Sequence, residues 1–272
     1  METEISQMEM PLSLSAREEI ESEIPQQIWQ QGSKMKGHLL MGRVATKRRV
    51  NYKAMVGTLT AAFNSVKKVE FRKLEEDRFV VVFDHARDQD RVREQCPWNF
   101  DNQLVVMSKM HELDNPMEVS LDWVEFHIQI LDLPINLFNR DMAKFLGNKL
   151  GIFIEVDLPK ERRTWGAILQ IRVCINITKP LQRVIKLRSP SGDLFSVWVT
   201  YERLPLFCFL CGIIGHSEGF CELRYKEIFE EPETLPFGMF LRAPTIRRSI
   251  DRVEGCRVHQ EGDRWKEIGK RC

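Results

Sequence analysis

The chain has 272 residues, of which 43% are hydrophobic, so it is long enough to bury one or two cores. Its net charge of +1 is too close to neutral to indicate a nucleic-acid partner, so any basic surface must be local. The seven cysteines are odd in number and lack framework spacing, which argues against a secreted disulfide scaffold.

The N-terminal segment, residues 1–37, is predicted to be a mobile acidic leader. Ser15 with Glu18 three positions on is a capping-box pattern, which predicts a short helix from Ala16 to Pro25. No signal-peptide pattern opens the chain, and no stretch approaches the roughly 18 apolar residues of a membrane span. We therefore expect an intracellular protein, nuclear or cytoplasmic, without membrane contact.

Residues 38–112 show a β-α-β-β-α-β pattern. Apolar runs predict strands over 39–44, from Val69, over 79–83 and over 104–107, and helical spacing predicts a helix after Asn51 and another over 88–94. The fold class expected is α+β, with a ferredoxin-like domain of the kind found in RNA-recognition modules. The glycines of the RNA-binding strand are missing here, and Phe79 and Phe83 share one alternation face, so core packing is favoured for both.

Residues 118–204 are predicted to form a second, mainly antiparallel α+β domain. Apolar residues indicate strands over 124–130, 169–177, 184–187 and 194–201. Between the first two strands, Asn139 is the expected N-cap of a helix and Gly151 its left-handed C-cap.

Residues 206–223 hold the strongest motif. Cys208, Cys211, His216 and Cys221 have the spacing Cys-x2-Cys-x4-His-x4-Cys, which predicts a CCHC zinc knuckle binding Zn²⁺. Three thiolates and one imidazole fill a tetrahedral zinc, so the ion is expected to be structural and the protein is not expected to be an enzyme. Gly212 and Gly215 fall where so short a loop must turn sharply.

Aromatic and basic residues around this motif predict contacts with unpaired nucleic acid. Phe209 and Phe220 are candidates for base stacking, although packing of the knuckle is the alternative role for both. Arg203, Arg224 and Lys226 are the candidate phosphate contacts. Lys47, Arg48 and Arg49 form a further basic cluster that fits phosphate binding, nuclear import or, as favoured here, a solvated loop.

Three further blocks carry a family resemblance: Cys96–Asp101, where relatives usually read Gly-Pro-Trp-x-Phe-Asp, then Leu131–Pro134 and Tyr201–Pro205. With the knuckle, they make the chain from Leu39 to Cys221 resemble plant retrotransposon-derived proteins in which a domain of unknown function precedes a zinc knuckle. The resemblance implies a gag-like role in coating an element's RNA. Cys96 departs from the family's glycine and is expected to be a small buried thiol.

The function expected from these features is binding of single-stranded nucleic acid, RNA ahead of DNA, without a small-molecule substrate. A protein-interaction or assembly module, with self-association, is the first alternative. A non-catalytic leader of a longer retroelement polyprotein is the second. Residues 224–272 are predicted to be a basic, poorly ordered tail.

Overall fold

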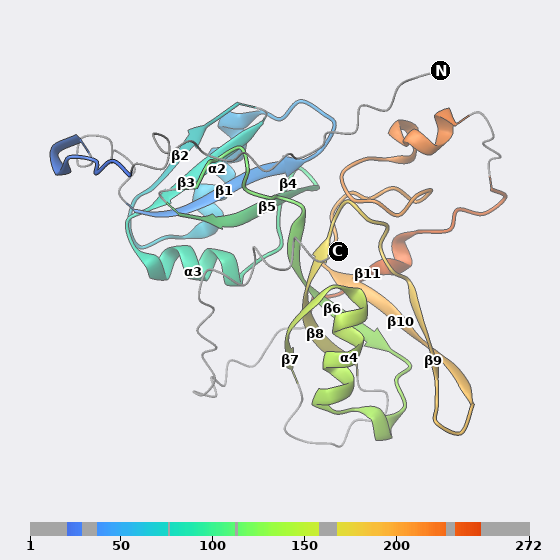
Figure 1. The fold of residues 1–272 in the computed structure, drawn as a ribbon. Helices are drawn as coiled ribbons and strands as arrows, with labels where there is room; N and C mark the ends of the chain where they lie inside the picture. The colour runs from blue at the N-terminus through green and yellow to red at the C-terminus, as the bar shows by residue number, and fades with distance from the viewer. Residues whose placement is uncertain are drawn as a thin grey trace.

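The computed structural model describes residues 21–28, 37–75, 77–111, 114–157, 168–226 and 232–245. Two sheets dominate it, joined where strand β5 leads into strand β6 (Figure 1). Most of the predicted leader and the tail from residue 246 lie outside these residues. Of the helix expected from Ala16 to Pro25, only residues 21–25 are described, and they are not helical, so that part of the prediction is wrong. No helix within the described ranges is long and apolar enough to cross a membrane.

The first sheet contains five strands in the order β2-β3-β1-β5-β4. Its elements follow one another along the chain as β1 (His38–Ala45), α2 (Tyr52–Phe63), β2 (Val69–Lys73), β3 (Arg78–Phe83), α3 (Ala86–Glu94), β4 (Trp98–Phe100) and β5 (Gln103–Met110). This is the predicted β-α-β-β-α-β sequence of elements with one short strand, β4, added at the sheet edge. All four strand pairings within the sheet are antiparallel.

Local chemistry explains where helix α2 begins. The side chain of Asn51 accepts a hydrogen bond from Ala54 N at 3.1 Å, so one of the helix's first N–H groups has a partner. Met55, Leu59 and Phe63 follow at helical spacing and are buried. The predicted N-cap is therefore confirmed, and so is the apolar stripe expected for this helix except at Ala62, which is exposed.

The first sheet is buried on both faces. On one face, strand residues that include Phe79 and Phe83 pack with α2 and α3 in one core cluster, as predicted for these two rings. On the other face, apolar residues join a larger cluster that also contains residues of the second sheet and of the knuckle. The strand residues of this second face are Leu39, Met41, Ala45, Val80, Val82, Leu104, Val106 and Met110.

The second sheet contains six strands: β6 (Trp123–Leu131), β7 (Ile152–Asp157), β8 (Leu169–Asn176), β9 (Val184–Arg188), β10 (Leu194–Glu202) and β11 (Arg242–Ala243). Its main path runs β11-β10-β6-β8-β7, with β9 paired to β10, and only the β10–β11 pair is parallel. Helix α4 (Arg140–Leu150) packs against β7 and β8. The expected α+β class with two mainly antiparallel sheets is therefore confirmed.

Helix α4 begins as predicted and ends differently. Asn139 accepts a hydrogen bond from Met142 N at 2.8 Å, which confirms the N-cap. Gly151 was expected to be left-handed, but its φ of 170° is extended, so that prediction is wrong. Glycine is needed at this position because the backbone passes very close to strand β8, where a Cβ would lie 2.2 Å from Cys174 O.

Three strands escaped the sequence patterns. Strand β4 has three residues and β11 has two, too few for an alternation to be recognised. Strand β7, Ile152–Asp157, has a register shift against β8 between Phe153 and Glu155, which interrupts its periodicity. Strand β11 also places part of the predicted basic tail in the second sheet.

Candidate metal centre

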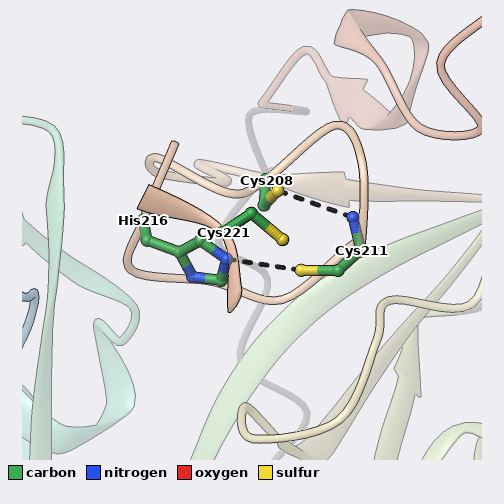
Figure 2. Close-up of side chains that lie close together, drawn as sticks. All are labelled: Cys208, Cys211, His216 and Cys221. Atoms are coloured by element: carbon green, nitrogen blue, oxygen red, sulfur yellow. Dashed lines mark hydrogen bonds between the residues drawn. The ribbon is translucent and has the colours of Figure 1, made fainter. Parts of the chain in front are cut away.

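The four predicted ligands come together on the loop that follows strand β10. The ligand atoms of Cys208, Cys211, His216 and Cys221 all lie within 4.8 Å of one another. The side chains point toward a common centre, with His216 Nε2 3.3 Å from Cys211 Sγ (Figure 2). Within the described residues, this is the one group of three or more such side chains placed to share a metal ion.

The backbone of the loop is shaped around the sulfurs. Cys211 N donates to Cys208 Sγ at 3.5 Å, and Ile213 N donates to Cys211 Sγ at 3.4 Å. Gly212 and Gly215 have φ values of 78° and 100°, in the left-handed region that favours glycine, which agrees with the sharp turns predicted there. N–H donors aimed at sulfur favour its negatively charged thiolate form, which is the form that binds zinc.

The protonation of the metal-free ligands sets the conditions for binding. Burial raises the pKa of Cys208 and raises the pKa of Cys211 to about 12. Burial, followed by the charge of Lys47, lowers the pKa of His216. Near neutral pH the thiols therefore carry protons that a metal must displace, whereas the imidazole is neutral and ready to bind.

Zinc fits this arrangement. Zn–S bonds of about 2.3 Å in a tetrahedral site place neighbouring sulfurs about 3.8 Å apart, within the 4.8 Å limit that encloses the four ligand atoms. Borderline-soft Zn²⁺ prefers thiolate and imidazole, the only ligand types present here. When bound, the ion would hold the loop in one conformation, with Cys208, Cys211, His216 and Cys221 as its ligands.

The knuckle is held against the first sheet. Leu206 N donates to Asn102 O at 2.8 Å, in the turn between β4 and β5. Gly215 approaches β1 so closely that a Cβ would lie 2.7 Å from Ala45 O. Lys47 Nζ forms an ion pair with Glu222 at 2.5 Å. Residues far apart in the sequence therefore fix where the metal loop sits.

Two blocks of the family resemblance meet at the same junction. Asn99 Nδ2 donates to Arg203 O at 2.8 Å, and Arg203 Nη2 donates to Cys96 O at 2.8 Å. Cys96 itself is buried, and burial raises its pKa to about 12, so the expected buried thiol is confirmed. The two blocks are thus hydrogen-bonded to each other at the start of the knuckle, a contact that no sequence pattern predicted.

A segment after the knuckle also packs on it. Phe237 N donates to Phe209 O at 3.0 Å, and a Cβ on Gly212 would lie 2.4 Å from the Phe237 ring. Arg242 Nη2 donates to Pro205 O at 3.1 Å, and its guanidinium lies 5.9 Å from the centre of the Phe207 ring. No sequence pattern marked these contacts, because they join isolated residues across a loop.

The predicted nucleic-acid contacts divide into exposed and supporting residues. Phe220 is 53% exposed, and Arg224 and Lys226 are exposed as well. Phe209 is partly buried, with its ring centre 5.0 Å from that of Phe207. Arg203 is exposed along part of its length but holds Cys96 O through its guanidinium. The structure therefore brings all five residues to the knuckle or its entrance, in different environments.

Comparison with known proteins agrees with this geometry. Residues 36–118 match the family model of a domain of unknown function, DUF4283, and residues 175–223 match that of a zinc knuckle. The chain carries a DUF4283 domain followed by a CCHC zinc knuckle. Its cofactor is Zn²⁺, as predicted.

Other comparisons add less. No curated protein matches the sequence. The first two RRM domains of the yeast poly(U)-binding protein Pub1 are 10% identical, and the match covers 50% of this chain and 81% of that one, with a TM-score of 0.22. A TM-score of that size is too low to indicate a shared fold.

Proposed function

We propose that the chain binds single-stranded nucleic acid through the exposed surface of its zinc knuckle. The observation that carries the proposal is Phe220, which lies 53% exposed directly before the last zinc ligand. A large ring held open to solvent by a structural metal offers a flat face on which an unpaired base can stack. A ring that is half exposed contributes little to core packing, so packing alone does not explain its position.

Local charge supports the proposal. Arg224 and Lys226 lie exposed just beyond Cys221, and Arg48 lies 5.7 Å from the centre of the Phe220 ring. Glu218 and Glu222 are nearby, but each is engaged, Glu218 by Phe209 N and Glu222 by Lys47. A nucleotide needs a cation to bind its phosphate and an aromatic ring on which its base can stack, and both are present here.

The five predicted contacts take different parts in this proposal. Phe220 stacks on a base, and Arg224 and Lys226 contact phosphates. Phe209 packs against Phe207 and shapes the knuckle from within. Arg203 fixes the entrance through Cys96 O, and its exposed portion contributes charge.

We further propose that the zinc is structural and that the protein is not an enzyme. Four protein ligands complete the tetrahedral preference of zinc, which leaves no position for an activated water. Cys208, Cys211, His216 and Cys221 therefore serve to fold the loop, and the bound ion supplies folding free energy.

The wider role that we propose follows the resemblance in sequence. The DUF4283 domain is assigned a ferredoxin-like arrangement, because β2-β3-β1-β5 has the strand order that two β-α-β units produce. We propose a gag-like function derived from a plant retroelement, inside the cell, with RNA preferred over DNA. We also propose that the chain is divided into a ferredoxin-like domain over 38–112, an antiparallel domain over 118–204 and the zinc knuckle over 206–223.

The test is fluorescence anisotropy with a labelled single-stranded RNA of mixed sequence, compared with the DNA of the same sequence. Cys208→Ser removes a zinc ligand and should therefore abolish the stacking of one base on the knuckle. One stacked base contributes about 1–3 kcal/mol, so affinity should fall by about 5- to 150-fold. Cys174→Ser is the matched control, because Cys174 is a buried thiol of strand β8 outside the metal cluster.

The outcome separates the candidate functions. Affinity that depends on salt and on bound zinc supports nucleic-acid binding. No affinity for either oligonucleotide, or affinity unchanged by Cys208→Ser, contradicts it. Tyr225, Met239 and Phe240, which are 79%, 57% and 54% exposed, favour the assembly alternative in that event. Concentration-dependent mass in light scattering would then be the supporting result.

A further inference from the structure

A loop of the DUF4283 domain lies against the knuckle's exposed ring. Thr46, Lys47 and Arg48, between β1 and α2, line a small hollow with residues of the knuckle, namely Leu206, Gly215, His216, Ser217 and Phe220. The hollow has a volume of about 20 Å³. This is room for a single water but not for a base, so any base must lie on the open surface beside it.

The two cations of this loop are in different situations. Lys47 is neutralised by its ion pair with Glu222. Arg48 has no carboxylate partner among the described residues, and its guanidinium instead lies 5.7 Å from the centre of the Phe220 ring. One positive charge of the first domain is therefore left beside the ring on which a base is proposed to stack.

The geometry of a guanidinium over a ring favours a phosphate as its further partner. A cation–π contact does not use the N–H donors of the guanidinium in hydrogen bonds to a carboxylate, which leaves them available. Those donors match a phosphate in a two-bond arrangement. The contact with the ring also restrains Arg48 before any ligand arrives, so less side-chain entropy is lost on binding.

We propose that the β1–α2 loop completes the nucleic-acid site of the knuckle, with a base stacked on Phe220 and the phosphate of the same nucleotide bound by Arg48. The inference rests on the proposed function and extends it, because the site then spans both the DUF4283 domain and the zinc knuckle. The knuckle detached from the DUF4283 domain would lack one phosphate contact.

The experiment measures the affinity of the full chain for labelled single-stranded RNA at several salt concentrations. Each phosphate contact on a single strand contributes about 0.7 to the slope of log affinity against log salt. Arg48→Ala should reduce that slope by about 0.7 and lower affinity about fivefold at 0.1 M salt. Arg48→Lys should restore the slope, because it keeps the charge.

Matched variants separate the contact from a general loss of charge. Arg49→Ala removes the same charge one residue further on, outside the residues that line the hollow. Lys186→Ala removes one positive charge from the exposed side of strand β9. Both should leave the slope near that of the parent. Phe220→Leu should lower affinity about 5- to 150-fold with the slope unchanged, because stacking involves no counterion.

The inference is overturned if Arg48→Ala binds like Lys186→Ala while the parent shows zinc-dependent binding. In that case the proposed function stands without a contribution from the first domain. If the parent itself does not bind, both proposals fail. Zinc content measured for every variant confirms that the metal site is intact and that the comparison concerns the surface alone.

Discussion

The sheet of the DUF4283 domain and the zinc knuckle differ in how much of their surface is open to solvent. The sheet alternates apolar residues on both faces, and both faces are buried. The knuckle keeps Phe220 53% exposed although it is far smaller. A β-α-β-β-α-β sequence of elements therefore does not by itself leave an open sheet, because later parts of the chain cover it.

The two regions also differ in what holds them together. The sheet is stabilised by buried apolar area shared among strands and helices. The knuckle's own cluster of buried residues consists of Cys208, Leu210 and Cys221, with Cys211 and Leu223 partly buried. So small a core cannot fold a loop alone, which is why the metal and the contacts with the first sheet matter there.

The largest effect expected from this difference is the change in zinc affinity with pH, which tests whether the metal holds the knuckle together. The pKa of Cys211 lies at about 12 and that of Cys208 is also raised, so the metal-free thiols stay protonated at neutral pH. Zinc must displace about one proton from each of these two thiols, so log affinity should rise by about 2 per pH unit on their account. Competition with a chromophoric chelator between pH 6 and 8 measures this slope.

Two variants test the assignment of that slope. Cys208→Ser removes one ligand thiol and should lower the slope by about 1. Cys174→Ser removes a thiol whose pKa is likewise raised to about 12 but which is no ligand, so the slope should not change. Zinc affinity that is independent of pH would show that the thiols are not the ligands.

The next effect concerns the covered face of the sheet. Leu104 is fully buried on the face shared with the second sheet, so Leu104→Ala should lower the free energy of unfolding by about 2–5 kcal/mol. Zinc content and RNA affinity of the folded protein should stay those of the parent, because the substitution touches neither the ligands nor Phe220. Chemical denaturation followed by circular dichroism, together with anisotropy, measures both quantities.

The control for that substitution is Leu194→Ala, which removes the same atoms from a residue that is 69% exposed. Its effect on unfolding should be within about 0.5 kcal/mol. Weaker RNA binding by folded Leu104→Ala, with zinc retained, would indicate that the covered face contributes to the site. That result would contradict the view that the knuckle, and not the buried sheet, forms the RNA-binding surface.

The sequence predicted the features that are set by local chemistry. The Asn51 and Asn139 caps, the apolar strands and the ligand spacing each lie within a few residues, so pattern and structure agree. The left-handed glycines of the knuckle were also foreseen, because a tight turn around an ion requires them.

The features that sequence reasoning missed depend on contacts between distant segments. Gly151 is required by its approach to strand β8 and not by its backbone angles, which no local pattern reveals. Arg48 was treated as part of a solvated loop, because nothing near it in the sequence indicates that Phe220 lies beside it. Only the folded chain shows which residues share a surface.

The smallest of the three expected effects concerns the contact between the knuckle and strand β1. It tests whether Arg48 and Phe220 share a surface only when the knuckle is packed on the first sheet. Gly215 has a φ of 100°, and a Cβ there would lie 2.7 Å from Ala45 O on β1. Gly215→Ala should therefore cost about 1–3 kcal/mol in backbone strain and displace the loop from the sheet. The four ligands are untouched, so zinc content should remain that of the parent.

Gly219→Ala is the control within the same loop, since a Cβ at Gly219 meets nothing within 4 Å. Thermal unfolding and RNA affinity should stay near those of the parent for this variant. If Gly215→Ala retains zinc but loses the salt-slope contribution of Arg48, docking is what joins the two regions into one site. If instead its slope and affinity match those of Gly219→Ala, the knuckle binds RNA without regard to its position on the sheet.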